Sequence, residues 1–285
     1  MDTSTLFCDG KRTLVGVVHL PATPGAPGSR GGGESGSGWG SALEAAVADG
    51  RALVQGGCDA VIVENFGDVP FFAEDVPAET VAAMALAVQA VRLEALAGGE
   101  REVAVGVNVL RNDWRSALGI CAATGASFVR VNVFTGAAVT DQGLIQGQAA
   151  EVLRERDRLC PGVVVLADVH VKHAVPLGGG AIGEAARDTL LRGGADGVIV
   201  SGRATGGEVN PAELREVREA LGGLGPDGGS GRLLVGSGLT EANAGELMAL
   251  ADGAIVGTWV KTNGDVRLPV DVKRVMRIRA ALDEA

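Results

Sequence analysis

The chain has 285 residues, of which 46% are hydrophobic, so it is long enough to bury a large core. A formal net charge of −10 and the lack of any basic run argue against a groove that tracks a nucleic acid. No stretch approaches the roughly 18 to 20 apolar residues of a membrane span. The four cysteines form no CxxC pair, and no basic start precedes a long apolar core, so we expect a cytoplasmic protein.

Short apolar, β-branched runs predict eight buried strands along the chain. These runs are 14–20, 60–65, 103–110, 128–133, 163–170, 197–202, 233–238 and 254–260. Alanine-rich helical patterns separate the runs and begin at Ser41 and near Glu79, Asp113, Asp141, Ala181, Pro211, Thr240 and Val270. Eight alternating strands and helices in a chain of this length predict an α/β fold with a single (β/α)8 TIM barrel over 1–285. The alternative is a doubly wound sheet, which usually carries a GxGxxG turn after its first strand; here that strand ends in HLPATPG.

The segment 24–40 is rich in Gly, Ser and Pro and shows no periodicity, which predicts a loop. Because it follows the first strand, it would lie at the barrel end that binds substrates, where it could act as a lid. The first helix is expected over 41–57, with Ser41 and Glu44 in a capping box and Gly56 at its end.

Polar side chains gather at the carboxyl ends of the expected strands, which is the end where TIM-barrel enzymes carry their active sites. They are His19, Glu64, Asn65, Asn108, Arg111, Asn112, Arg130, Asn132, Asp168, His170 and Ser201. The amino-terminal halves of the same runs are almost purely apolar. Since unpaired polar groups are costly to bury, this distribution favours an active site over a set of structural salt bridges.

The hexapeptide DVHVKH, 168–173, holds two of the three histidines and one of the four lysines. Asp168 and His170 are two residues apart on a strand, so their side chains are expected on the same side. We predict that they form the main catalytic pair, and that Glu64 and His19 complete the catalytic set.

Lys172 and His173 would lie in the loop after this strand and contact the substrate. A lysine whose pKa is lowered can also attack a carbonyl carbon and form a Schiff base. Neither Lys172 nor Lys261 falls within a strand, so substrate or phosphate contact is the preferred interpretation for both.

Glycine motifs after the last two expected strands predict a phosphate site, as is frequent in TIM barrels. The first, GSG, precedes Thr240, where a helix is expected to begin, and the second, GT, precedes Lys261. The expected phosphate-binding residues are Gly236, Ser237, Gly238, Gly257, Thr258 and Lys261. The segment SGRATGG, 201–207, is a further anion-binding candidate through Thr205.

A metal site is the less favoured possibility. His19, Glu64, Asp168 and His170 have the donor types for a divalent ion, but the chain has no HExxH-type motif. We therefore expect no tightly bound metal and no other cofactor, with a divalent ion as the alternative.

Longer segments resemble the BtpA/SgcQ family. They include VGVVHLPATPGAPG, VIVENFGDVPF, VGVNVLRND, ADVHVKHAVPL and DGAIVGTWVKTNGDVRLPVD, and the resemblance covers about residues 13–276. It implies a TIM barrel of the ribulose-phosphate-binding or aldolase-like kind. One branch is named for photosystem I biogenesis and another as a nucleosidase, so these names fix no single reaction. The family motifs cover His19, Glu64, Asn65, Asp68, Asn108, Arg111, Asn112, Arg130, Asn132, Thr140, Asp141, Asp168, His170, Lys172, His173, Thr205, Ser237, Thr258 and Lys261.

Together these features predict an enzyme that acts on a phosphorylated sugar or a nucleoside-like small molecule. We expect cleavage of a glycosidic C–N bond by carboxylate and histidine acid–base chemistry. The alternatives are a sugar-phosphate isomerase, epimerase or aldolase-type lyase, and a non-catalytic assembly factor for a membrane complex. The last is less favoured because this acidic chain has no basic amphipathic helix to face lipid. A homo-oligomer is expected from the fold. The expected substrate-binding residues are Asn65, Asn108, Arg111, Arg130, Asn132, Asp141, Lys172, His173, Ser201 and Thr205.

Overall fold

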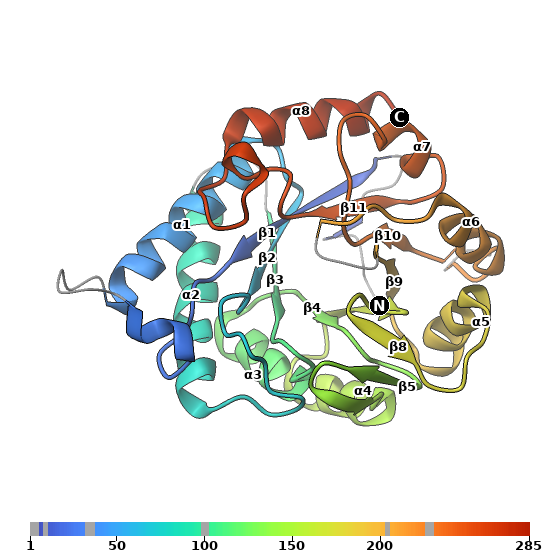
Figure 1. The fold of residues 1–285 in the computed structure, drawn as a ribbon, viewed down its shortest axis with the longest axis horizontal. Coiled ribbons are helices and arrows are strands. Elements are labelled where there is room, and N and C mark those ends of the chain that lie inside the picture. The colour runs from blue at the N-terminus through green and yellow to red at the C-terminus, as the bar shows by residue number, and fades with distance from the viewer. Residues whose placement is uncertain (1–5, 8–10, 32–37, 98–102, 203–205, 226–230) are drawn as a thin grey trace.

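The computed structural model describes residues 6–7, 11–31, 38–97, 103–202, 206–225 and 231–285. Eight parallel strands close into a barrel in the order β1-β11-β10-β9-β7-β4-β3-β2, with helices around it (Figure 1). The strands are β1 (Thr13–His19), β2 (Ala60–Glu64), β3 (Ala104–Asn108), β4 (Phe128–Val131), β7 (Val164–Val169), β9 (Gly197–Val200), β10 (Leu233–Val235) and β11 (Gly253–Val256). The predicted TIM barrel is confirmed, and each barrel strand lies within one residue of a predicted run.

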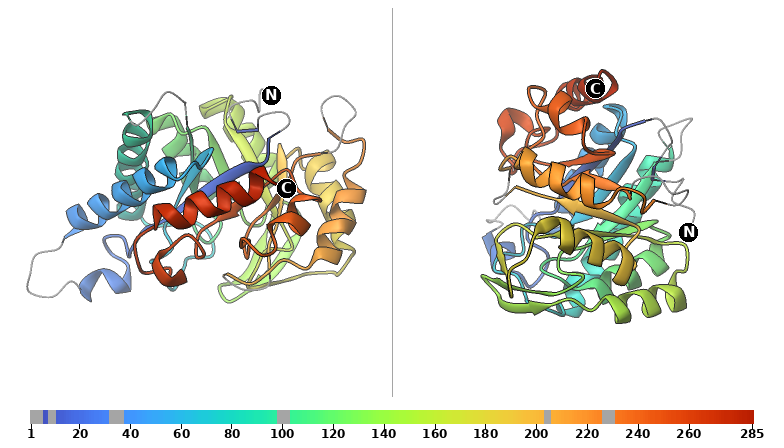
Figure 2. Two further views of the ribbon diagram at one scale, coloured as in Figure 1. Left: turned by 90° about the horizontal axis from the view of Figure 1, so that it is seen from above. Right: turned by 90° about the vertical axis from the view of Figure 1, so that its right-hand side faces the viewer.

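The helices are α1 (Trp39–Gln55), α2 (Ala78–Ala97), α3 (Trp114–Thr124), α4 (Ala149–Leu159), α5 (Ile182–Arg187), α6 (Pro211–Ala220), α7 (Ala244–Met248) and α8 (Val272–Asp283). Short helical turns are η1 (Pro27–Gly31), η2 (Asp188–Arg192) and η3 (Thr262–Gly264). In the side view of Figure 2, η1 and η3 lie at the same end of the barrel, so the segments after β1 and β11 gather there. None of the helices in the described ranges has the length and apolarity needed to cross a membrane.

Apolar side chains fill the barrel interior below its carboxyl-terminal end. Val17, Ile62 and Leu166 belong to one buried cluster in which alternate residues of the strands point inward. Phe128 is a fully buried member of this cluster, and Gly106 opposite leaves room for its ring, because a Cβ at Gly106 would collide with it. A second buried cluster packs the outer faces of the strands against the helices. The space that remains for a ligand therefore lies above the apolar layers.

A three-stranded antiparallel sheet, absent from the predicted elements, joins the loops that follow β4 and β7. It consists of β5 (Ala137–Thr140), β6 (Gly143–Gln146) and β8 (Ala174–Pro176). The helix predicted near Asp141 is wrong, because Asp141 lies in the β5–β6 turn. Thr140 stabilises that turn: its hydroxyl accepts the Gln142 N–H and donates to the Gly143 carbonyl.

Two predicted helix starts are also wrong. The first helix begins at Trp39 rather than Ser41, and the Ser41 hydroxyl donates to the Gly38 carbonyl instead of capping the helix. At the other start, the Thr240 N–H donates to the Asn243 side chain, and α7 begins only at Ala244. The predicted end of α1 at Gly56 is confirmed. Of the predicted loop 24–40, residues 32–37 lie outside the described residues, and the rest includes η1 and the start of α1.

Candidate active site

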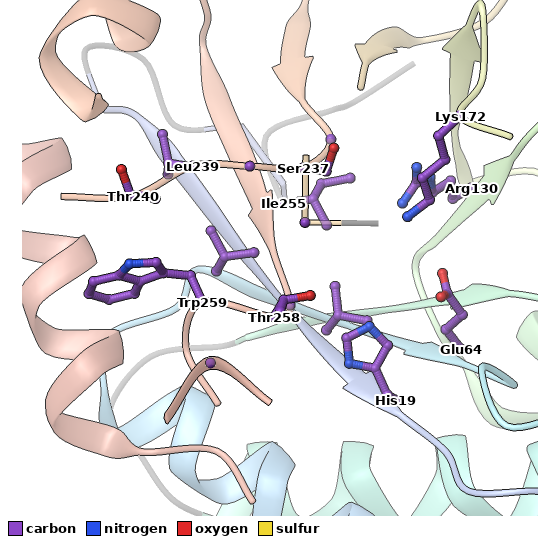
Figure 3. Close-up of a pocket in the computed structure, with 17 residues that line it drawn as sticks. His19, Glu64, Arg130, Lys172, Ser237, Leu239, Thr240, Ile255, Thr258 and Trp259 are labelled. Carbon is purple, nitrogen blue, oxygen red and sulfur yellow. The ribbon is translucent and has the colours of Figure 1, made fainter. Parts of the chain in front are cut away.

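A cavity of about 170 Å³ opens at the carboxyl-terminal end of the barrel (Figure 3). Its charged and ionisable wall contains His19, Glu64, Arg130 and Lys172. The opposite wall consists of the loops after β10 and β11, which include residues 236–240 and 257–259. The cavity thus lies where polar strand ends and glycine-rich loops predicted an active site.

Strand register explains why three polar residues share one layer. His19 of β1 pairs with Glu64 of β2, which in turn pairs with Asn108 of β3. Each lies two residues beyond an inward-facing position of its strand, so each points into the barrel. Asn108 Nδ2 donates to Glu64 Oε2 at 2.6 Å, and no other hydrogen bond reaches that carboxylate within the described ranges. Glu64 is 4% exposed, and it lines the cavity.

The carboxylate of Asp168 is fully engaged. It accepts two hydrogen bonds from Arg130, from Nε at 2.9 Å and Nη2 at 2.8 Å. It also accepts one from Asn132 Nδ2 at 2.8 Å and one from the Ser201 hydroxyl at 3.3 Å. Such a bidentate, buried pair fixes the guanidinium in the cavity wall. The geometry therefore favours a positioning role for Asp168 over the predicted acid–base role.

His170 does not join Asp168 as a catalytic pair. The strand β7 ends at Val169, and His170 has φ +50°, so strand alternation no longer sets its direction. It lines a second cavity beside α5, and no hydrogen bond joins it to Asp168 in the described part of the chain. Burial lowers the pKa of His170, and the charges that oppose this are Glu213 and Glu216 of α6. The predicted catalytic pair of Asp168 and His170 therefore has to be corrected. Because β7 ends before His170, the two side chains do not share one side of a strand.

Lys172, two residues further on, enters the first cavity beside Arg130 (Figure 3). Arg111 Nη2 donates to the Lys172 carbonyl at 2.5 Å and holds this loop over the barrel. Burial lowers the pKa of the Lys172 ammonium, and the nearby guanidinium groups of Arg130 and Arg111 lower it further, against Glu64 and Asp168. Within the described residues, no ion pair joins this ammonium to a carboxylate, whereas the guanidinium of Arg130 is paired with Asp168.

His19 is a neutral imidazole at the cavity wall. Burial lowers its pKa to about 4, Glu64 opposes that shift, and Lys261 and Lys172 add to it. Its Nδ1 atom is buried without a hydrogen-bond partner. The ring makes an edge contact with Phe66, with centroids 4.7 Å apart. A buried ring nitrogen without a partner is costly, so this atom is available to a ligand.

The opposite wall offers backbone donors to an anion. The Ser237 hydroxyl is used within the protein, because it accepts the Gly202 N–H and donates to the Gly207 carbonyl. By contrast, no hydrogen bond within the described ranges uses the backbone N–H groups of Ser237, Gly238 or Thr258. Glycine at 257 is required by space, since a Cβ there would lie 2.5 Å from His19 Cε1. This wall has the composition of a phosphate site, though without the helix predicted at Thr240.

Lys261 does not contribute to this wall. Its Nζ lies 2.5 Å from Asp49 Oδ2 of α1, and the residue is 2% exposed. The other Asp49 oxygen accepts the Val270 N–H at 2.7 Å. The predicted phosphate contact of Lys261 therefore has to be corrected. Its charge is neutralised in a buried ion pair with Asp49, which joins the segment before α8 to α1.

Other predicted substrate ligands hold the protein together. Asn65 accepts the Leu110 N–H and donates to Asp68, so it fixes the loop after β3. Asp141 and His173 are exposed in the antiparallel sheet region. Thr205 lies outside the described residues.

The sequence analysis missed Trp259, which lines the cavity and stacks against Arg274, whose guanidinium carbon lies 4.3 Å from the ring centroid. Trp259 directly follows the GT motif, and this position could have identified it as a residue of the cavity.

The four side chains considered as metal ligands do not converge, because Asp168 is engaged by Arg130 and His170 lies beside α5. Among the described residues, no group of three or more His, Cys, Asp or Glu side chains is arranged to hold a metal ion.

Comparisons with known proteins agree with the fold and with the family resemblance. The model described as the BtpA family matches residues 10–284. The photosystem I biogenesis protein BtpA of Synechocystis is 42% identical over 275 residues, which is 95% of this chain and 88% of that protein. An uncharacterized protein of Pyrococcus furiosus is 41% identical over 264 residues, covering 93% and 92% of the two chains.

Solved structures show the same fold at low identity. Thiamine phosphate pyrophosphorylase of P. furiosus superposes with a TM-score of 0.55 at 14% identity, over 95% of this chain and 96% of that one. N-(5′-phosphoribosyl)anthranilate isomerase of P. furiosus gives a TM-score of 0.54 at 13% identity, over 96% and 100%. At this identity the likeness concerns the barrel and not its chemistry.

Proposed function

The chain belongs to the BtpA family, and we propose that it is an enzyme that moves a proton next to the carbonyl group of a phosphorylated sugar or a related small molecule. The phosphate would bind to the backbone N–H groups of Ser237, Gly238 and Thr258. The reacting carbon atoms would then lie across the cavity, beside Glu64 and His19.

The main support for this proposal is the positive charge that lies near Glu64 in the cavity. Arg130 and Asp168 neutralise each other in their ion pair. What remains in the cavity is one carboxylate, Glu64, and one cation, Lys172, while Arg111, which anchors the Lys172 backbone, has a buried Nε without a partner. Such a site stabilises an oxyanion or enolate that develops in a transition state. Isomerase, epimerase and lyase reactions pass through species of that sign.

Cleavage of a glycosidic C–N bond, the reaction first expected from the sequence, needs a negatively charged site rather than a positively charged one. The sugar becomes cation-like in the transition state, and a free carboxylate should stabilise it. Asp168 is not free for that task, and Glu64 shares the cavity with the Lys172 ammonium. The nucleosidase prediction is therefore less well supported than its carbonyl alternatives.

Glu64 is the proposed general base and His19 the proton carrier. Glu64 Oε2 is fixed by Asn108, which orients the carboxylate toward the cavity. His19 is neutral at neutral pH because of its low pKa. A neutral imidazole both donates and accepts a proton, which suits transfer between neighbouring carbon and oxygen atoms. The ammonium of Lys172, which forms no ion pair among the described residues, would stabilise the negative oxygen.

Proton transfer is tested in heavy water. The protein is incubated in D2O with a panel of aldose and ketose phosphates and nucleotides, and ¹H NMR follows both deuterium uptake next to the carbonyl and release of a nucleobase. We expect uptake with at least one sugar phosphate. Glu64→Gln should abolish it, and Glu246→Gln, at an exposed position of α7, should not. Base release without uptake would favour the nucleosidase, and neither signal with any compound would contradict the proposal.

A role in assembling a membrane complex, suggested by the name of the Synechocystis relative, leaves the convergent cavity side chains without a purpose. The homo-oligomer and the cytoplasmic location stay predictions.

A further inference from the structure

Lys172 stands apart from the other described basic groups of the cavity. The guanidinium of Arg130 is held by Asp168 at 2.8 Å. Arg111 is anchored through its Nη2 atom to the Lys172 carbonyl. The Lys172 ammonium lines the cavity, yet none of the contacts described for it is a hydrogen bond or an ion pair of Nζ. A partly buried cation that lies near two guanidinium groups, and has no ion pair among the described residues, loses its proton more readily than an exposed one.

The position of Lys172 also argues against a role in holding phosphate. In Figure 3 it lies next to Arg130 and near Glu64, whereas Thr240 and Trp259 mark the far side of the cavity. Ser237 and Thr258, whose backbone N–H groups have no partner within the described ranges, lie between these two sides. A phosphate bound there would place the other end of a small substrate toward Lys172 and Glu64.

We propose that Lys172 is a covalent catalyst, whose Nζ forms an imine with the carbonyl carbon of a phosphorylated aldose, ketose or keto acid. This inference rests on the proposed function, because it uses the same phosphate site and the same base. It names the substrate class more narrowly: the substrate must present an aldehyde or ketone carbon in its open-chain form.

The covalent step balances without any further reagent. The neutral amine adds to the carbonyl carbon, a C–N bond forms, and one proton moves from the nitrogen to the carbonyl oxygen to give a carbinolamine. A second proton on that oxygen releases it as water and leaves the protonated imine. Glu64 then removes a proton from the neighbouring carbon, and the electron pair moves into the imine to give an enamine. Reprotonation and hydrolysis by water restore the amine and the carbonyl group.

The surroundings of Lys172 fit each part of this sequence. Burial and the two guanidinium groups lower the pKa of the ammonium, so that more of it is the nucleophilic amine at neutral pH. His19, whose Nδ1 is buried without a partner, can carry protons to and from the leaving oxygen. The Lys172 carbonyl is fixed by Arg111, so the backbone that carries the amine is anchored over the cavity.

The other lysines of the chain serve as internal references. Lys261 is buried against Asp49, and Lys11 pairs with Asp59 at 2.8 Å. Lys273 is exposed at the start of α8. A lowered pKa raises the fraction of neutral amine at pH 7, so Lys172 should react faster with a carbonyl than Lys273.

Reductive trapping tests the imine. The protein is incubated at pH 7 with sodium cyanoborohydride and dihydroxyacetone phosphate or ribose 5-phosphate, and modified lysines are located by peptide mass spectrometry. We expect one adduct per chain, on Lys172, and its formation should slow when inorganic phosphate competes. Lys172→Arg keeps the positive charge but should abolish the adduct, whereas Lys273→Met should leave it unchanged. Calorimetry with the same sugar phosphates, and thermal unfolding of each variant, report binding and folding separately.

The outcomes separate the imine from the function on which it rests. If the wild-type protein binds the sugar phosphates but Lys172 is trapped no faster than Lys273, the imine is overturned and the proposed function stands. If the wild-type protein binds none of them and is not trapped, both fail. If a folded Lys172→Arg protein exchanges deuterium as fast as the wild type, Lys172 acts only through its charge and the imine is likewise overturned.

Discussion

Lys261→Met should destabilise the fold without weakening phosphate binding. The ammonium lies 2.5 Å from Asp49 and is 2% exposed, so its removal leaves a buried carboxylate with the Val270 N–H as its remaining donor. Breaking a buried ion pair by removing one partner costs about 3–5 kcal/mol. At roughly 2–4 °C per kcal/mol for a chain of this size, the melting temperature should fall by some 6–20 °C.

The assay compares urea unfolding and thermal unfolding of wild type, Lys261→Met and the double variant Lys261→Met/Asp49→Asn. The double variant should recover most of the lost stability, because it removes the uncompensated charge and keeps an amide oxygen that can accept the Val270 N–H. Lys273→Met, an exposed lysine, serves as the matched control. Calorimetry with inorganic phosphate gives the affinity of each folded protein. An unchanged unfolding midpoint, or a selective loss of phosphate affinity in Lys261→Met, would refute the structural role assigned to this ion pair.

Two further predictions concern the wall formed by His19 and Gly257. Because burial lowers the pKa of His19 from 6.5 to about 4, the unfolded chain binds a proton there before the native protein does. Stability should therefore fall as pH drops from about 6.5 to about 4, by roughly 3 kcal/mol, and His19→Gln should flatten this part of the profile in urea titrations; an unchanged slope would contradict the assignment. Gly257→Ala should displace the His19 ring, which lies 2.5 Å from the added Cβ, at a cost of about 1–3 kcal/mol; calorimetry should show weaker sugar-phosphate binding, and wild-type affinity would contradict the close packing.

The barrel could be predicted because its signal is local. A parallel strand buried on both faces gives a short, nearly continuous apolar run, and all eight barrel strands have one. The antiparallel sheet was missed for the same reason. The segments Ala137–Thr140 and Gly143–Gln146 are short and half exposed, and only the turn at Thr140 separates them. Their sequence does not distinguish a hairpin from a helix start.

The ion-pair partners of the charged side chains were harder to predict than the location of these side chains at the barrel end. Strand ends correctly located His19, Glu64 and Arg130 at one cavity, but no local pattern indicates which charges neutralise each other. Asp49, the partner of Lys261, is 212 positions away in an alanine-rich helix. The left-handed backbone of His170 depends on where β7 ends, which the apolar run does not mark to the residue.

These pairings change the chemistry that the same residues suggest. As a set of side chains, Asp168, Glu64, His19 and His170 resemble two acid–base pairs, which would suit cleavage of a glycosidic bond. Once Asp168 is committed to Arg130 and His170 lines the second cavity beside α5, one carboxylate and one neutral imidazole remain in the first cavity with the Lys172 ammonium, which has no ion pair among the described residues. Such a site gives little stabilisation to a cationic transition state, but it stabilises the negative charge that develops on a carbonyl oxygen. The position of Lys172 in the loop after β7, outside any strand, is therefore no argument against covalent catalysis, because Arg111 supplies the anchorage that a strand would otherwise give.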